Sequence, residues 1–180
     1  VERTDDATET TTTETVAPVV GLYMPDAMSA FETGGETYLI IANEGDSRDF
    51  DEDRVGDLVE DGALDAGFAD RLRALGLIDD DADTDVGLER LEVLTTEGDL
   101  DGDGDIDQLT AFSTRGFTIW DTAGEVVFDS GDLAETYLAA TVPDRFNDDD
   151  GDDGEDRSDA KGPEFEAVEK YFGVQCSYME

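Results

Sequence analysis

Hydrophobic positions lie in short runs separated by polar and glycine-rich segments. Residues 38–42 are apolar at every position, as in a strand that is buried on both faces. Gly34 and Gly35 precede this run, and another apolar stretch lies before them at residues 21–31. We therefore expect strands at 21–31 and 36–43, joined as a hairpin by the Gly-Gly turn.

Between residues 55 and 77 the apolar spacing becomes helical. Many of its large apolar residues recur three or four positions apart: Leu58, Leu64, Phe68, Leu72 and Leu75. Gly62 and Gly67 weaken a continuous helix. The pattern predicts one or two short helices here, after a polar segment at 44–53.

Strand-like patterns return after this region. The expected strands are 88–95, 108–114, 116–121 and 125–129. The sequence Thr122-Ala123-Gly124 forms a tight turn between the last two, and residues 133–140 read as a short helix or turn. The fold class predicted is mainly β: a meander of short antiparallel strands with acidic loops, as in a propeller or sandwich.

The two ends differ from the middle in composition. Residues 1–17 are rich in Thr and Glu and have little to bury, so we expect a disordered linker. Residues 18–166 form the β-rich unit, and residues 167–180 an atypical C-terminal tail. The chain does not begin with Met, so we expect that a leader was removed or that this is an internal piece.

The charge is extreme. The chain has 50 acidic and 11 basic residues and a net charge of −39. Such a charge destabilises a compact state unless concentrated salt screens it, which indicates a halophilic protein. Disorder is the alternative; the 38% of hydrophobic residues, gathered in strand-like runs, favours a folded chain.

Charge and composition also exclude partners. Nucleic acids and anionic membranes need basic patches, which this chain lacks. No apolar run approaches the roughly 20 residues of a membrane-spanning helix. Cys176 is the only cysteine, so an internal disulfide is excluded.

The clearest motif is GDLDGDGDIDQ at residues 98–108. It places Asp99, Asp101 and Asp103 at positions one, three and five, Gly104 at six and Asp107 at nine, as in the first half of a calcium-binding loop. A hard cation needs several oxygen ligands at about 2.3–2.6 Å, and the glycine allows the sharp bend. We therefore predict a calcium site whose ligands are Asp99, Asp101, Asp103, Asp105 and Asp107.

Position twelve of this loop departs from an EF-hand. It is Thr110 instead of a bidentate Glu, and the flanks read as strands, so we predict a strand–loop–strand site. Asp105 fills position seven, which supplies a main-chain carbonyl. The alternative is an ordinary solvated acidic loop. The acidic run at 147–156 is a second calcium loop or a salt-facing loop, and 79–85 is expected to face solvent.

Four segments in order resemble the choice-of-anchor I proteins: GLYMPDAM (21–28), TYLIIANEGDSRD (37–49), GDLDGDGDIDQLTAFSTRGFTIWD (98–121) and RSDAKGPEFE (157–166). These are large secreted or surface-anchored β-propeller proteins of bacteria and archaea. They are often described as alkaline-phosphatase-like and are related to mesenchyme-specific cell-surface glycoproteins. The resemblance implies an extracellular or cell-surface location.

The resemblance also implies a partial propeller of about two blades, with loops gathered near a central channel. The residues that it places on these loops are Pro25, Asp26, Asn43, Glu44, Asp46, Arg48, Arg115, Asp159, Lys161, Glu164 and Glu166. Nine of them, all except Pro25 and Asp159, are the predicted second metal or ligand set. The alternative is that Asp26, Asn43 and Arg48 tie the loops together by hydrogen bonds and ion pairs.

The chain departs from the family after Glu164. The family continues with Pro-Glu-Gly, whereas this chain reads Phe165-Glu166-Ala167. A closed propeller needs more strands than this chain supplies, so we expect a fragment. Its partners are then calcium and the rest of a propeller, or another surface protein.

Two functions follow. One is a calcium-binding extracellular surface module for adhesion or scaffolding. The other is a metal-dependent, alkaline-phosphatase-like phosphoesterase that uses the acidic set Glu44, Asp46, Glu164 and Glu166. The chain has no His, which removes the commonest general base, and no nucleophile motif. No catalytic residue is identified, and the first function is favoured.

Overall fold

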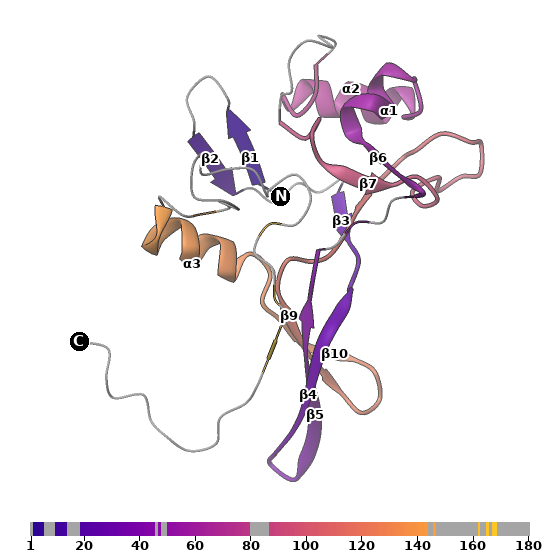
Figure 1. Ribbon diagram of the computed structural model, residues 1–180. Coiled ribbons are helices and arrows are strands. Elements are labelled where there is room, and N and C mark those ends of the chain that lie inside the picture. Colours follow the sequence, from indigo (N-terminus) through magenta and orange to yellow (C-terminus); the bar gives the residue numbers. More distant parts are fainter. Residues whose placement is uncertain are drawn as a thin grey trace.

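The computed structural model describes residues 2–5, 10–13, 19–45, 47, 50–79, 87–143, 146, 162, 165 and 167–168. Within these residues the chain is mixed α/β, with more strand than helix: two four-stranded sheets, a two-stranded ladder and three helices (Figure 1). The predicted excess of strand over helix is confirmed. The described residues do not show a propeller.

The first sheet has the order β10-β9-β5-β4 and is antiparallel throughout. Its strands are β4 (Pro25–Thr33), β5 (Glu36–Asn43), β9 (Phe117–Asp121) and β10 (Val126–Asp129). The predicted hairpin is confirmed as β4 and β5. Gly34 and Gly35 have φ of 63° and 87°, which residues without a Cβ adopt readily.

The second sheet has the order β3-β8-β7-β6. Its strands are β3 (Val19–Gly21), β8 (Leu109–Ala111), β7 (Glu92–Leu94) and β6 (Glu52–Arg54). The expectation of antiparallel strands throughout is wrong here, because β3 runs parallel to β8. The polar segment 44–53 also contributes its last two residues to β6. This strand has no apolar pattern and is held in the sheet by its pairing with β7.

The predicted helical region contains two helices, α1 (Val55–Glu60) and α2 (Ala66–Ala74). These two helices confirm the prediction for this region. A third, α3 (Leu133–Thr141), lies after β10, where residues 133–140 were predicted as a short helix or turn. Among the described helices, none has the length and apolar character needed to cross a membrane.

The hydrophobic core lies between α1, α2 and the second sheet. Its fully buried members include Val55, Phe68, Leu72, Val93 and Leu109. This core fixes the helices against β7 and β8, the two strands that flank the aspartate-rich loop.

The N-terminal segment holds a short ladder. The strands β1 (Glu2–Asp5) and β2 (Thr10–Thr13) pair antiparallel, within the stretch predicted as a linker. The division at residues 17 and 166 stays a prediction. The acidic run at 147–156 and all but Asp79 of the run at 79–85 lie outside the described residues.

Candidate metal centre

The aspartate-rich loop connects β7 to β8, which pair antiparallel with Val93 opposite Ala111. Its two ends meet at Gly98, whose carbonyl accepts hydrogen bonds from Asp107 N (2.9 Å) and Gln108 N (3.2 Å). Gly98 has a φ of 100°, and a Cβ there would overlap the Gln108 carbonyl oxygen. The narrow neck of the loop therefore requires glycine.

Inside the neck, aspartate carboxylates hold the loop backbone. Asp99 accepts hydrogen bonds from Gly102 N (2.6 Å) and Gly104 N (3.1 Å), one on each oxygen. Asp107 Oδ2 accepts from Leu100 N at 2.9 Å. The carboxylates thus turn toward the interior of the loop, as the motif predicts for a cation site.

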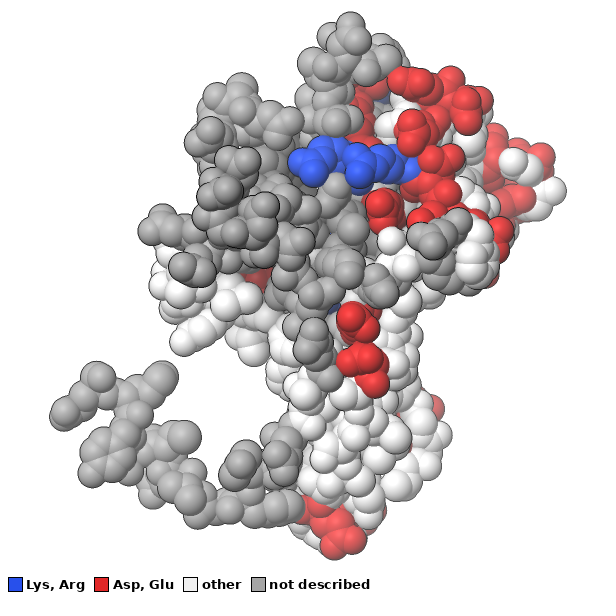
Figure 2. Space-filling view, in the orientation of Figure 1, with Lys and Arg blue, Asp and Glu red and all other residues white. Residues whose placement is uncertain are grey.

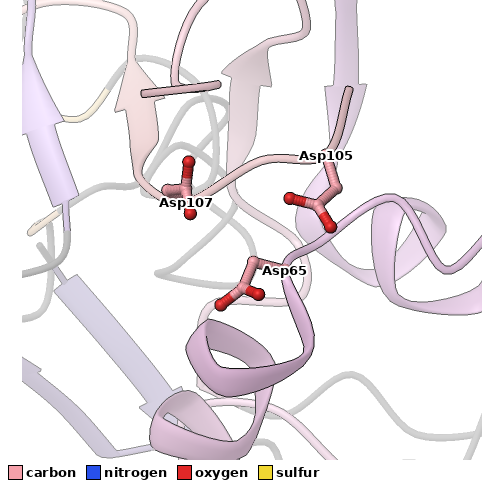
Figure 3. Close-up of side chains that lie close together, drawn as sticks. All are labelled: Asp65, Asp105 and Asp107. Carbon is pink, nitrogen blue, oxygen red and sulfur yellow. The ribbon is translucent and has the colours of Figure 1, made fainter. Parts of the chain in front are cut away.

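Two groups of three carboxylates are close enough to share a cation. One consists of Asp99, Asp101 and Asp107, and the other of Asp65, Asp105 and Asp107 (Figure 3). In each group one oxygen from every residue lies within 4.8 Å of the others. Asp107 belongs to both groups, so its carboxylate is common to the two candidate positions.

Four of the five predicted ligands belong to these groups, and Asp103 belongs to neither. Its amide donates to Asp101 Oδ1, and its own Oδ1 accepts from Asp105 N, both at 3.2 Å. Asp103 therefore lies between the two groups and adds charge to both. Thr110 at position twelve is buried on β8, consistent with the predicted departure from an EF-hand.

Asp65 was not predicted as a ligand. It precedes α2 and caps that helix, because its Oδ1 accepts a hydrogen bond from Phe68 N at 2.7 Å. A parallel bridge between Leu64 and Ile106 brings it to the loop: Ile106 N donates to Ala63 O (2.9 Å) and Asp65 N donates to Ile106 O (3.0 Å). The site thus joins the start of α2 to the β7–β8 loop.

The sequence alone could show that Asp65 caps a helix, but not that it lies beside the aspartate-rich loop. A helix-capping aspartate can be recognised locally, because Asp65 stands directly before the helical stretch. Its approach to Ile106 depends on a contact across the fold, and no local spacing predicts it.

Crowded carboxylates change each other's ionisation. Burial raises the pKa of Asp105 to about 6, with further contributions from a hydrogen bond with Asp103 and from the charges of Asp103, Asp65 and Asp107. The charge of Asp103 likewise raises the pKa of Asp101. Asp105 Oδ1 is buried without a hydrogen-bond partner. A bound cation would satisfy this oxygen and offset the repulsion.

A model of the choice-of-anchor I domain matches residues 4–172. This chain belongs to the choice-of-anchor I family. The match begins within β1 and spans both four-stranded sheets and the aspartate-rich loop. Neither the curated proteins nor the solved structures include a match to the chain.

The second cluster that the family resemblance implies is only partly visible. Five of the nine residues of the predicted ligand set lie outside the described residues: Asp46, Arg48, Lys161, Glu164 and Glu166. Of the other four, Asp26 is exposed on β4, and the Glu44 amide donates to Met24 O at 3.1 Å. None of the four belongs to a carboxylate group among the described residues.

Asn43 and Arg115 instead hold the choice-of-anchor I fold together. Asn43 is fully buried. Its side-chain Nδ2 donates to Thr118 Oγ1 (3.3 Å), and its main-chain carbonyl oxygen accepts from Ser113 Oγ (2.9 Å). Ser113 Oγ also accepts from Arg115 N at 2.8 Å. These contacts join the end of β5 to the turn before β9.

Arg115 forms a buried ion pair that was not predicted. Its Nη1 lies 3.6 Å from Glu135 Oε1 on α3, and both side chains are at least nine-tenths buried. Gly162 packs against the guanidinium, since a Cβ there would come within 3.0 Å of Nη1. Arg115 thereby fixes α3 and Gly162, from one of the four resembling segments, beside β9.

Proposed function

We propose that the loop between β7 and β8 binds calcium, and that this choice-of-anchor I chain works as a calcium-stabilised surface module. The observation that carries the proposal is the pair of carboxylate groups that share Asp107, each with its oxygens within 4.8 Å. Such groups can hold a metal ion, and the spacing of the aspartates favours calcium.

The donor set supports a hard cation. Every candidate side-chain ligand is a carboxylate, and calcium takes six to eight oxygens in flexible geometry. Magnesium requires a near-ideal octahedron and keeps several waters, which an irregular loop serves less well. The proposed ligands are Asp99, Asp101, Asp105 and Asp107, with Asp65 added by the fold; Asp103 contributes charge from between the groups.

The proposed effect of calcium is structural. The loop leaves β7 and enters β8, and Asp65 begins α2, so one cation-binding region connects three elements of the core. Calcium would neutralise repelling carboxylates where these elements meet. We expect it to raise the free energy of unfolding by binding the native state and not the unfolded chain.

An extracellular or cell-surface position and a role in adhesion or scaffolding belong to the same proposal. Membership of the choice-of-anchor I family supports a surface-associated module. A setting within a larger propeller, completed by further chain or by another surface protein, stays a prediction. The phosphoesterase alternative gains no support. It uses four acidic residues, and the structure describes only one of them, Glu44.

Isothermal titration calorimetry tests calcium binding directly. In molar NaCl, calcium should bind the wild-type chain, and the Asp99→Asn/Asp101→Asn variant should lose at least tenfold in affinity. The matched control is Asp70→Asn, which removes one exposed carboxylate on α2 outside both groups. Equal affinity in all three proteins would refute the proposed site.

A further inference from the structure

Strand β10 forms one edge of the first sheet. Among the described residues it is last in the strand order and pairs with β9 alone. All four of its residues are exposed, and three in succession are large and apolar: Val126 (38%), Val127 (50%) and Phe128 (44%). The outer N–H and C=O groups of an edge strand can pair with a further strand. The apolar edge of β10 is therefore a place where another extended segment can add.

The C-terminal part of the chain arrives close to this edge. The Phe165 ring contacts Phe117, with centroids 6.1 Å apart, and Phe117 contacts Phe128 on β10 at 5.6 Å. Before it, Gly162 packs against the Arg115 guanidinium, just ahead of β9. The residues that follow Phe165 thus leave from β9, next to β10 and two strands away from the opposite edge, β4.

The segment that follows has the sequence pattern of a half-buried strand. Residues 169–180 lie outside the described residues, so the pattern is taken from the sequence alone. From position 172 to 178, in the sequence FGVQCSY, large or apolar side chains alternate with small or polar ones. A period of two residues is typical of a strand with one covered face.

The charge of this segment also suits the first sheet. No charged side chain lies between residues 171 and 179, although 34% of the whole chain is charged. Acidic side chains gather over the part that holds α1, α2 and β6, whereas the visible surface of the first sheet is mostly uncharged (Figure 2). In a chain of net charge −39, a neutral segment avoids the repulsion that the acidic run 147–156 would meet.

We propose that residues 171–178 add to the first sheet as a fifth strand, on the outer edge of β10. Phe165 holds the preceding chain beside β9, and the six residues from 166 to 171 span up to about 20 Å. The distance from β9 across β10 to the next strand position is two strand spacings, about 10 Å. The segment is therefore within reach of this edge.

The proposed strand runs antiparallel to β10. The register between β9 and β10 places Asp129 opposite Thr118, so the C-terminal end of β10 lies near Phe117. A segment that comes from Phe165 reaches this end first and continues towards Val126. The alternating apolar positions then lie on the side of the sheet that carries the Phe117 and Phe165 rings, and the polar positions lie on the other side.

The role of this strand is to cover the edge. An open edge with three apolar residues in succession invites strand pairing between chains. This risk is greatest in concentrated salt, because the charge repulsion that keeps acidic copies apart is then screened. A strand supplied by the same chain would occupy the edge without a partner molecule.

Cys176 is the only cysteine and provides a direct probe of this strand. In 3 M NaCl, its reaction with dithiobis(nitrobenzoate) in the full chain should be at least tenfold slower than in the chain unfolded by guanidinium chloride. Phe128→Glu places a charge on the covered edge and should raise the native rate at least tenfold. Met28→Glu is the control, since Met28 is 63% exposed but lies on β4, at the opposite edge, and the rate should not change.

A further variant tests the strand pattern itself. Cys176→Ser/Ser177→Cys moves the thiol to the uncovered side, where it should react at least tenfold faster than Cys176. Circular dichroism establishes that each variant is folded, and Val127→Glu replaces Phe128→Glu if the latter unfolds.

Three results would overturn the proposal. One is a native Cys176 that reacts as fast as in the unfolded chain, and another is slow reaction that persists in folded Phe128→Glu. The third is protection of Cys176 that grows with protein concentration, because a second copy would then supply the cover.

Discussion

The Asp65 and Asp107 carboxylates lie together although they come from opposite sides of the core, one at the start of α2 and the other at the end of the β7–β8 loop. Hydrogen bonds between Asp65 N and Ile106 O, and between Ile106 N and Ala63 O, fix this approach. A cation bound here would therefore act on the tertiary structure as well as on one loop.

Replacing Asp65 by Asn should weaken calcium binding without unfolding α2. Asn is as good an N-cap as Asp, so the hydrogen bond to Phe68 N should be kept while the charged ligand is lost. We expect calcium affinity to fall about tenfold, equal to about 1.4 kcal/mol. Titration calorimetry measures the affinity, and an affinity equal to that of the wild type would remove Asp65 from the site. In Asp65→Ala the cap is lost too, at an additional cost to stability of about 1 kcal/mol.

Calcium affinity should depend on pH near 6. The native pKa of Asp105 is about 6, above its ordinary value of 3.8. Between these two pH values and without a cation, Asp105 is largely protonated in the native chain and largely ionised in the unfolded chain. The stability of the cation-free protein should thus fall as the pH rises from about 4 through 6. Calcium competes with this proton, and its affinity should fall by up to about tenfold per pH unit below 6.

Titrations at pH 5, 6 and 7 in the same salt measure this effect. Calcium binding should also release protons at pH 6, which appears as a dependence of the binding heat on the buffer. An affinity that is constant from pH 5 to 7 would contradict a role for Asp105 as a ligand.

Gly98→Ala should destabilise the protein whether or not calcium is present. The added Cβ would meet the Gln108 carbonyl oxygen, and the φ of 100° disfavours any residue with a side chain. We expect a loss of about 2–4 kcal/mol from strain and displacement of the neck. Gly124→Ala is the control: its φ is also positive, at 85°, but a Cβ there meets open space. Chemical denaturation should show a smaller loss for the control, near 1 kcal/mol.

Breaking the buried pair of Arg115 and Glu135 should be costly. Glu135→Gln leaves the guanidinium buried beside a neutral partner, and we expect a loss of about 3–5 kcal/mol. The double variant Arg115→Met/Glu135→Gln removes the buried charge and should recover part of this loss. Urea denaturation of these two variants and of Arg115→Met completes a double-mutant cycle. Additive losses would show that the two residues are not coupled.

Local pattern was sufficient for the elements whose signals lie close together in the sequence. The β4–β5 hairpin follows from apolar runs around two glycines, and the carboxylate groups of the β7–β8 loop follow in part from aspartates at alternate positions. Helix α2 follows from spacing and from its capping aspartate. In each case the determining interactions span only a few residues.

Features set by distant contacts could not be predicted in the same way. Strand β6 is polar and exists through its pairing with β7. Strand β3 pairs in parallel with β8, from Val19 opposite Leu109, across about half the length of the chain. Glu135 becomes a buried partner only when α3 meets the turn that carries Arg115. The residues that family resemblance placed in one ligand cluster divide, where described, between structural contacts and the surface.

Thermal unfolding with and without calcium tests the central claim most directly. With free calcium at one hundred times its dissociation constant, binding to the native state adds about 2.7 kcal/mol, which for a chain of this size raises Tm by about 5–10 °C. Asp107→Asn, which affects both carboxylate groups, should abolish that rise. An equal rise in the wild type and in Asp107→Asn would show that calcium acts elsewhere, and no rise in the wild type would contradict the account.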